Sequence, residues 1–167
     1  MDKLWAPWRY EYIKSNASEN DDSCLFCRVI SEGDDEKNLI IYRGRNAYIM
    51  LNRYPYNNGH LMIVPYNHLS EIYMLNDDEM LEVMKLSSLS VKVLRNEFSP
   101  EGFNIGLNLG KIAGAGIDEH LHIHIVPRWK GDTNFMPVIA DTKVIPEALK
   151  DTYRRLREHI SLLEEER

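Results

Sequence analysis

The segment 120–126 (HLHIHIV) alternates histidine with apolar residues, and this alternation constrains the fold more than any other feature of the chain. Successive side chains of a β-strand point to opposite faces, so the pattern predicts a strand in which His120, His122 and His124 share one face. A rise of about 3.3 Å per residue would place neighbouring histidines about 6.5 Å apart. The apolar residues between them would point into a core.

Three interpretations of this histidine face are open. Isolated histidines in strands are commonly ordinary surface or core residues, but three of the chain's six histidines lie in this one segment, which disfavours that interpretation. Imidazoles two residues apart on a strand can bind one zinc ion. A neutral imidazole is also a competent nucleophile near pH 7. The alternation by itself does not separate a nucleophile from a metal ligand.

The rest of the chain predicts an α+β domain built on an antiparallel β-sheet with two main helices. Asn76, with Glu79 three residues later, predicts the start of a helix that ends near 99–100. A second helix is predicted over about 146–164. The segments with strand-like composition are 38–42, 47–51, 61–64, 103–109 and 119–127.

Length and composition indicate one domain. The chain has 167 residues, of which 44% are hydrophobic, so we expect a single domain over 1–167 with an N-terminal arm over about 1–23. A net charge of −6 argues against long nucleic acid as a partner, because such binding requires an excess of basic residues. No apolar run has the length of a membrane span or marks a leader sequence, so we expect no membrane partner and a cytoplasmic location.

The two cysteines of the chain, Cys24 and Cys27, are three positions apart. That spacing is too short to cross-link a secreted fold and is typical of metal binding or redox chemistry. Two thiols supply half of a tetrahedral zinc site, and a Cys-x-x-Cys pair is equally compatible with redox activity. The spacing alone leaves both interpretations open.

The histidine segment resembles the signature of the histidine triad (HIT) superfamily, His-φ-His-φ-His-φ-φ, in which φ is apolar. Segments 52–55 (NRYP) and 59–65 (GHLMIVP) are similar to a second block of that superfamily, and the resemblance covers about residues 24–130. The flanking segments 4–9 (LWAPWR) and 131–135 (GDTNF) resemble the branch that includes bacterial diadenosine tetraphosphate phosphorylases. The resemblance implies a HIT-like fold.

The same resemblance implies an enzyme that cleaves a purine nucleotide or dinucleoside polyphosphate, such as diadenosine tetraphosphate, while a histidine briefly carries the nucleotidyl group. Phosphate is expected as the acceptor, and water is the alternative. HIT relatives are commonly homodimers, so we expect a homodimer or a higher symmetric oligomer. Two other functions are a zinc-dependent hydrolase, with the histidines as metal ligands, and a nucleotide-binding regulatory protein with little turnover.

The resemblance also implies roles for individual residues. His122 would attack the α-phosphorus, His124 would contact the phosphate and the departing group, and His60 would help to orient them. Asn52 would contact the ribose, and Asn108 would contact the phosphates. The residues expected near the base are Leu51, Leu61 and Met62.

The glycine-rich segment 110–116, which includes Gly114 and Gly116, can bring backbone N–H groups close to phosphate oxygens. Several relatives carry a hydroxyl or amide side chain shortly before the triad, whereas this chain has Gly-Ile-Asp-Glu over 116–119. The basic residues that are candidates to replace that contact are Arg9, Lys111 and Arg128.

Zinc-bearing members of the superfamily place two metal ligands where this chain has His68 and His120. The resemblance therefore implies a structural Zn²⁺ site formed by Cys24, Cys27, His68 and His120. His120 would then bind the metal, while His122 and His124 would carry out the phosphorus chemistry. The alternative is a pair of free thiols, with His120 hydrogen-bonded to the backbone.

Overall fold

The computed structural model describes residues 24–132 and 147–165 of the chain. The helices are α2 (Leu25–Glu32), α3 (Asp77–Phe98) and α5 (Leu149–Glu165), with two short 3-10 helices, η1 (Ile72–Met74) and η2 (Lys111–Ala113). The strands are β1 (Ile40–Arg43), β2 (Ala47–Leu51), β3 (Leu61–Pro65), β4 (Gly102–Leu107) and β5 (Ile123–Arg128). They form one antiparallel sheet in the order β1-β2-β3-β5-β4. The predicted α+β class with an antiparallel sheet is confirmed.

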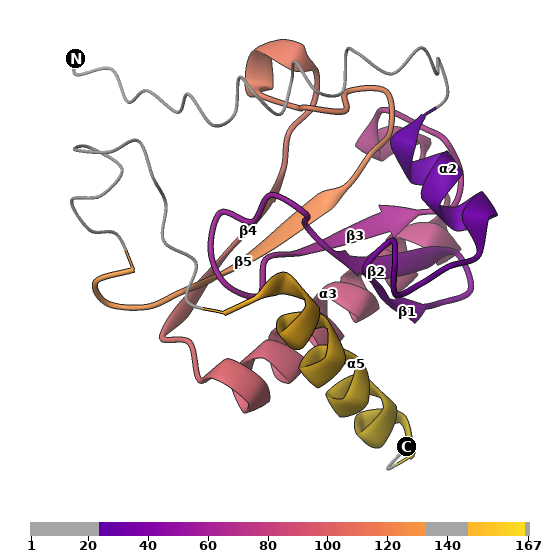
Figure 1. The fold of residues 1–167 in the computed structure, drawn as a ribbon. Coiled ribbons are helices and arrows are strands. Elements are labelled where there is room, and N and C mark those ends of the chain that lie inside the picture. The colour runs from indigo at the N-terminus through magenta and orange to yellow at the C-terminus, as the bar shows by residue number, and fades with distance from the viewer. Residues whose placement is uncertain (1–23, 133–146, 166–167) are drawn as a thin grey trace, which may run out of the picture.

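Helices cover both faces of the sheet. Figure 1 shows α3 and α5 together on one side, with α2 on the other. The side chains of β2 alternate between two cores: Ile49 and Leu51 pack with α3 and α5, whereas Tyr48 and Met50 pack with α2. Because neither face meets water, β2 and β3 are buried at every position and carry apolar residues on both sides.

Helix α3 begins at the predicted residue. The Asn76 side chain accepts a hydrogen bond from the Glu79 backbone N–H at 3.0 Å, and the Glu79 carboxylate accepts one from the Asn76 N–H at 2.9 Å. This reciprocal pair satisfies two of the N–H groups that a helix start leaves without partners. The predicted N-terminus of this helix is confirmed.

We expect Asn76→Ala to lower the free energy of unfolding by about 1 kcal/mol, because it removes the cap acceptor from the first turn of α3. Urea unfolding followed by circular dichroism would measure the change. Ser88→Ala is the matched control, since Ser88 is exposed on the same helix. Equal midpoints for Asn76→Ala and the wild type would contradict the expected contribution of the cap.

The two predicted main helices are α3 and α5, and the shorter helix α2 was not expected. This helix has eight residues, and its N-cap residue Cys24 makes no side-chain capping bond, so the usual start signal is absent. Its end does carry a signal: Gly33 adopts φ 70°, the left-handed conformation that favours glycine after a helix. The sequence places Gly33 among acidic turn residues, which concealed this role.

The prediction that all three triad histidines lie on a strand is wrong. β5 begins at Ile123, so His124 is on the strand, while His120 and His122 precede it. The ladder between β3 and β5 runs from Leu61↔Ile125 to Ile63↔Ile123. Two residues further along β3 is Pro65, which has no N–H to donate to the ladder. The Leu121 N–H instead donates to the Leu69 carbonyl at 2.6 Å.

Other boundaries differ by one to three residues. β1 begins at Ile40 rather than at position 38, because Leu39 lies in a turn and adopts φ 60°, which is not an extended conformation. β4 covers Gly102–Leu107 rather than 103–109, and α5 begins at Leu149. The predicted arm and the start of the last helix near Pro146 lie outside the described residues. Within 24–132 and 147–165, every helix is too short or too polar to cross a lipid bilayer.

Candidate active site and metal centre

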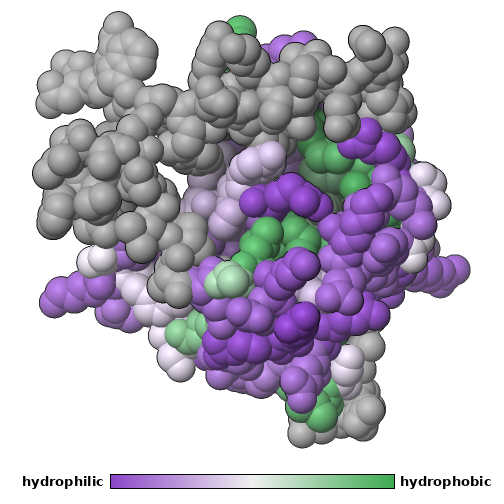
Figure 2. Space-filling view, in the orientation of Figure 1, coloured by the Kyte–Doolittle hydropathy of each residue, from purple (hydrophilic) through white to green (hydrophobic). Residues whose placement is uncertain are grey.

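A cavity of about 550 Å³ lies on the α2 side of the sheet. Its walls come from α2, from the ends of β2 and β3, and from the turn that follows η2. His122 and His124 both line it. Figure 2 shows apolar surface beside α2 and at the middle of this face, surrounded by hydrophilic residues. The triad therefore borders a space of the size that small-molecule ligands occupy, about 300–1,000 Å³.

His122 is buried, and one of its two ring nitrogens is already committed. Its Nδ1 lies 2.9 Å from the backbone carbonyl of His120, and a carbonyl can only accept, so Nδ1–H donates. In the neutral ring Nε2 then keeps its lone pair. Burial lowers the pKa of His122, which favours this neutral form at pH 7. Phe26 of α2 contacts the ring, with centroids 5.0 Å apart.

His60 fixes the ring of His124 through a chain of hydrogen bonds. The Tyr56 backbone N–H donates to His60 Nδ1 at 3.1 Å, so the ring hydrogen of His60 is on Nε2. That Nε2–H donates to His124 Nδ1 at 2.9 Å. Neutral His124 therefore carries its hydrogen on Nε2. The Tyr56 ring stacks on His60 with centroids 4.9 Å apart, which holds this buried ring in place.

The two neighbouring imidazoles thus offer opposite functions. His122 presents an unprotonated Nε2, and His124 presents an Nε2–H donor. Their ring centroids are 4.8 Å apart, and the ring planes are inclined at 79°. Such a pair can attack an electrophilic phosphorus and donate a hydrogen bond to an oxygen of the same group.

A second cluster lies on the other side of Phe26, where four ligand atoms lie within 4.8 Å of one another. Cys24 Sγ is 3.2 Å and Cys27 Sγ is 3.6 Å from His120 Nδ1, and Cys27 Sγ is 3.4 Å from His68 Nδ1. His120 Nε2–H donates to the Pro65 carbonyl at 2.9 Å, so its Nδ1 lone pair faces the sulfurs.

This donor set fits a zinc ion. Tetrahedral zinc with bond lengths of about 2.0–2.3 Å has neighbouring ligand atoms about 3.3–3.8 Å apart, close to the three separations observed. The His120–Pro65 bond is the kind of outer contact that fixes the tautomer of a metal-binding imidazole. Burial raises the pKa of the Cys24 thiol to about 11, so without a cation this thiol stays protonated at pH 7. All four predicted metal ligands lie together.

The HIT domain family matches residues 34–131, which is more than half of the chain. The chain belongs to the HIT family. It is 43% identical over 161 residues to the AP-4-A phosphorylase of Mycobacterium tuberculosis, a match that covers 93% of this chain and 83% of that protein. The predicted family is confirmed.

Solved structures agree with the fold of this HIT protein. A Zn-bound histidine triad family protein from Mycobacterium smegmatis superposes with a TM-score of 0.69 at 23% identity, covering 87% of this chain and 98% of that one. A diadenosine triphosphate hydrolase from Plasmodium falciparum superposes with a TM-score of 0.60 at 21% identity, covering 77% and 78% of the two chains. At these identities the similarity establishes the fold.

Two of the residues predicted near the base of this HIT protein do not border the cavity. Leu51 and Leu61 are fully buried against α3 and α5 and do not line the cavity. They form a register pair, and the adjacent pair Met50↔Met62 points to the opposite face, where the cavity lies. Met62 was predicted, whereas Met50 was missed. Counting alternation back from Met62 through the hairpin would have selected Met50 instead of Leu51.

Three of the other predicted nucleotide contacts, Asn52, Gly114 and Gly116, do line the cavity. Asn52 also shapes the loop after β2, because its Oδ1 accepts the Tyr54 backbone N–H at 2.9 Å. Gly114 adopts φ 91°, a conformation that favours glycine, at the turn that brings the backbone to the cavity. Asn108 does not line this cavity and borders a different one beyond His124.

Two of the three basic residues suggested as replacement phosphate contacts, Lys111 and Arg128, do not line this cavity. Lys111 lies 3.9 Å from the carboxylate of Asp118 and is largely exposed. Arg128 forms an ion pair with Asp132. Neither Lys111 nor Arg128 lines the cavity, and Arg9 lies outside the described residues.

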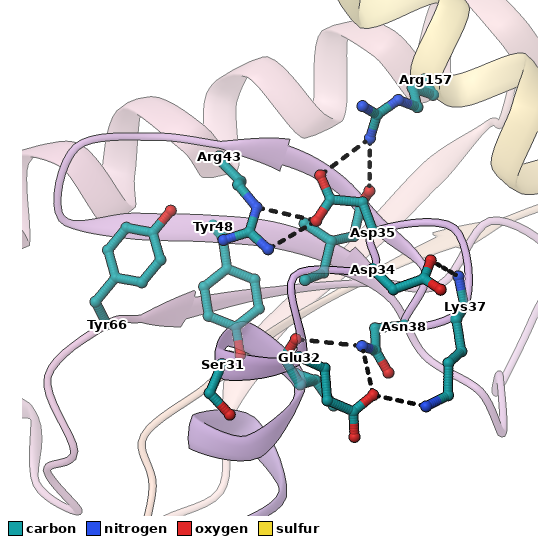
Figure 3. Close-up of polar contacts among 12 residues, drawn as sticks. Ser31, Glu32, Asp34, Asp35, Lys37, Asn38, Arg43, Tyr48, Tyr66 and Arg157 are labelled. Atoms are coloured by element: carbon teal, nitrogen blue, oxygen red, sulfur yellow. Dashed lines mark hydrogen bonds and ion pairs between the residues drawn. The ribbon is translucent and has the colours of Figure 1, made fainter.

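A polar cluster at the C-terminal end of α2 was not predicted. Glu32, Lys37 and Asn38 line the cavity, and Figure 3 shows them pointing toward one another. The Lys37 ammonium and the Asn38 amide both donate to the Glu32 carboxylate, at 2.8 and 3.1 Å. The hydrogen bond from Lys37 lowers the pKa of Glu32. In the sequence these residues appear as an acidic residue, a turn, and then Lys-Asn. That pattern is also typical of an ordinary surface loop, so it gave no signal for a site.

The cavity is locally cationic although the chain carries a net negative charge. Of the described residues, three cations, Arg28, Lys37 and Arg53, line it together with one acidic residue, Glu32. Arg53 is positioned by donating to the Lys37 carbonyl at 2.9 Å. A small anionic ligand is therefore compatible with this acidic protein.

Proposed function

We propose that this protein cleaves dinucleoside polyphosphates, with His122 as the nucleophile and inorganic phosphate as the acceptor of the nucleotidyl group. One observation carries the proposal: the Nδ1–H of His122 is bound to a backbone carbonyl, which leaves Nε2 with its lone pair beside a cationic cavity. The 43% identity to the AP-4-A phosphorylase of Mycobacterium tuberculosis over 93% of the chain supports the substrate class and the acceptor.

In the first step, Nε2 of His122 attacks the α-phosphorus, an N–P bond forms, and the P–O bond to the leaving polyphosphate breaks. The ring then carries a positive charge, which the His120 carbonyl stabilises through the Nδ1–H bond. The Nε2–H of His124 donates a hydrogen bond to the phosphate oxygens or the leaving oxygen, and His60 holds it in that tautomer. His60 is a positioning residue in this scheme.

In the second step, an oxygen of inorganic phosphate attacks the same phosphorus, and the N–P bond breaks. Diadenosine tetraphosphate would thus give ATP in the first step and ADP in the second. Attack by water in place of phosphate would give AMP. Gly114 and Gly116 line the cavity, and in this proposal the Gly116 backbone N–H binds phosphate oxygens in both steps, since the Gly114 N–H already donates to the Lys111 carbonyl at 2.9 Å.

The geometry disfavours a catalytic metal held by the triad. In the described part of the chain the residues gathered as a ligand set are Cys24, Cys27, His68 and His120, and neither His122 nor His124 belongs to it. We propose that these four residues bind a structural zinc ion that ties α2 to the triad loop. The Zn-bound relative from Mycobacterium smegmatis supports this proposal.

We also propose that the protein forms a symmetric dimer. β4 is at the end of the sheet order, and Ile105 on this strand is 53% exposed, although it is a large apolar side chain. Within 24–132 and 147–165 only β5 pairs with β4, and a sheet edge with an exposed apolar residue is suited to pairing with a second copy. The cytoplasmic location remains a prediction.

Product analysis tests the proposed reaction. With diadenosine tetraphosphate as substrate, we expect ADP and ATP in equal amounts, formed only when inorganic phosphate is present. Anion-exchange chromatography of the reaction at several phosphate concentrations would measure this. Sulfate at equal ionic strength is the control for a general salt effect.

AMP and ATP appearing at one rate with and without phosphate would make the protein a hydrolase. The phosphate acceptor would then be wrong, while the role of His122 would stand. Binding of the dinucleotide without any product would favour the regulatory protein.

A further inference from the structure

A second cavity, of about 420 Å³, lies on the far side of His124 from the first. Tyr56 and His124 line both cavities, whereas His122 lines only the first. The His124 imidazole therefore lies between the two cavities, whereas the proposed nucleophile His122 borders only the first. A polyphosphate substrate that extends from the first cavity past His124 would enter the second cavity.

The walls of the second cavity are formed mainly by β4 and β5. Asn104 pairs with Val126 and Gly106 pairs with His124 in the sheet register. Residues directly opposite in an antiparallel pair point to the same face, so these side chains all lie on the face that carries the active site. The remaining residues that line the cavity are Asn57, Ile105, Leu107, Asn108 and Arg128.

The charge of this lining differs from that of the first cavity. Among the described residues of this lining the one cation is Arg128. It is neutralised by Asp132, to which it donates at 2.5 and 3.0 Å, and it also donates to Asn104 Oδ1 at 2.7 Å. Asn104 and Asn108 supply amide groups, and Val126 supplies apolar surface on the same face as His124. Amides and aliphatic side chains without net charge suit a nucleoside, with its hydroxyls and flat base, better than they suit polyphosphate.

The floor beside His124 is open because residue 106 is glycine. A Cβ built at Gly106 meets no atom of the described residues within 4 Å, so packing within that part of the chain does not need this space. Gly106 has no positive φ and lies on a regular strand, so larger residues can adopt its backbone conformation. A side chain at this position would extend into the second cavity without displacing protein atoms.

We infer that the second cavity binds the nucleoside of the leaving half of the substrate. The inference rests on the proposed function, since it assigns the first cavity to the transferred nucleotide and the second to the other nucleoside. The protein would then prefer substrates with a nucleoside at both ends of the polyphosphate. The preference would come from Asn104, Asn108 and the open floor at Gly106.

The test compares two substrates with the same reacting bond. Diadenosine tetraphosphate carries adenosine at both ends, and adenosine tetraphosphate carries it at one. The quantity compared is kcat/KM for diadenosine tetraphosphate divided by kcat/KM for adenosine tetraphosphate. We expect Gly106→Val to lower this ratio about tenfold or more, because the branched side chain occupies the nucleoside space. Gly102→Val is the matched control, since Gly102 is on the same strand, outside the cavity, and its added Cβ also meets no atom within 4 Å.

Equilibrium binding makes the test independent of turnover. The same ratio would be measured from dissociation constants in a His122→Asn background by titration calorimetry. An unchanged ratio in Gly106→Val would overturn the inference. So would an equal loss for both substrates accompanied by dissociation in sedimentation, because the cavity would then belong to a subunit contact. If the wild type turns over neither substrate, the proposed function fails, and the binding ratio still decides the inference.

Discussion

Substitution of His122 by asparagine is expected to lower the turnover of diadenosine tetraphosphate by about 10⁴-fold or more, because the variant cannot form the covalent adduct. An amide nitrogen has no available lone pair, whereas Nε2 of the native ring does. Nucleotide affinity should change little, since the cavity walls from α2, β2 and β3 stay in place. Initial rates and titration calorimetry would measure the two effects separately.

His159→Asn is the matched control for this prediction. His159 lies on α5, where its Nδ1 is 3.2 Å from the Glu97 carboxylate, and it does not line the cavity. The same chemical change there should leave turnover within about twofold of the wild type, as expected for a substitution outside the site. Substantial turnover by His122→Asn would remove the nucleophile from the proposal.

His124→Ala should separate adduct formation from the rest of the reaction. The variant keeps the nucleophile, so the protein should still gain one nucleotidyl group, but slowly, because the Nε2–H donor to phosphate or leaving oxygen is lost. Mass spectrometry after an alkaline quench, which preserves a phosphoramidate, would detect the adduct. An adduct on His122→Asn would place the nucleophile elsewhere.

The alternation of segment 120–126 predicted the chemistry of the site better than its secondary structure. Ile123 and Ile125 pack against the helices as alternation requires, and His124 faces the cavity. The pattern did not reveal that strand pairing stops at Ile123, because the cause is Pro65, far away in the sequence. A period of two is a local signal, whereas the length of a strand depends on its partner.

The missing parts of the site share a physical reason. The cavity wall formed by α2 and the Glu32–Lys37–Asn38 cluster depends on a short helix whose stability comes from tertiary packing of Phe26 and Val29. Short helices lack a strong sequence signal of their own. Likewise, the sequence did not show that Met50 rather than Leu51 faces the cavity, because β2 is apolar on both faces.

The metal centre leads to the second large effect. We expect protein purified without added metal to contain about one zinc per chain, and a strong chelator to lower its melting temperature by about 10 °C. A closed four-ligand site contributes directly to folding, here by joining α2 to the loop that carries His120. For a chain of this size, each 1 kcal/mol of lost stability lowers the melting temperature by about 2–4 °C. Elemental analysis and differential scanning calorimetry would measure the two quantities.

Two variants of α2 distinguish metal binding from packing. Cys24→Ser removes a ligand, whereas Val29→Thr introduces a similar polar change at another buried position of the same helix. Both should melt below the wild type. Val29→Thr should retain zinc and respond to chelator, while Cys24→Ser should lack zinc and show no further response.

Turnover after chelation decides what the ion does. His122 depends on His120 through the backbone carbonyl, 2.9 Å from Nδ1, so loss of zinc should loosen the nucleophile and reduce the rate. It should not abolish the rate below the lowered melting temperature, because neither His122 nor His124 is part of the ligand set. Complete loss of activity in chelated but folded protein, reversed by zinc, would favour a catalytic ion. If instead the wild type contains no metal and the chelator does not change its melting temperature, no ion contributes to the stability of the fold. Cys24 and Cys27 would then be free thiols.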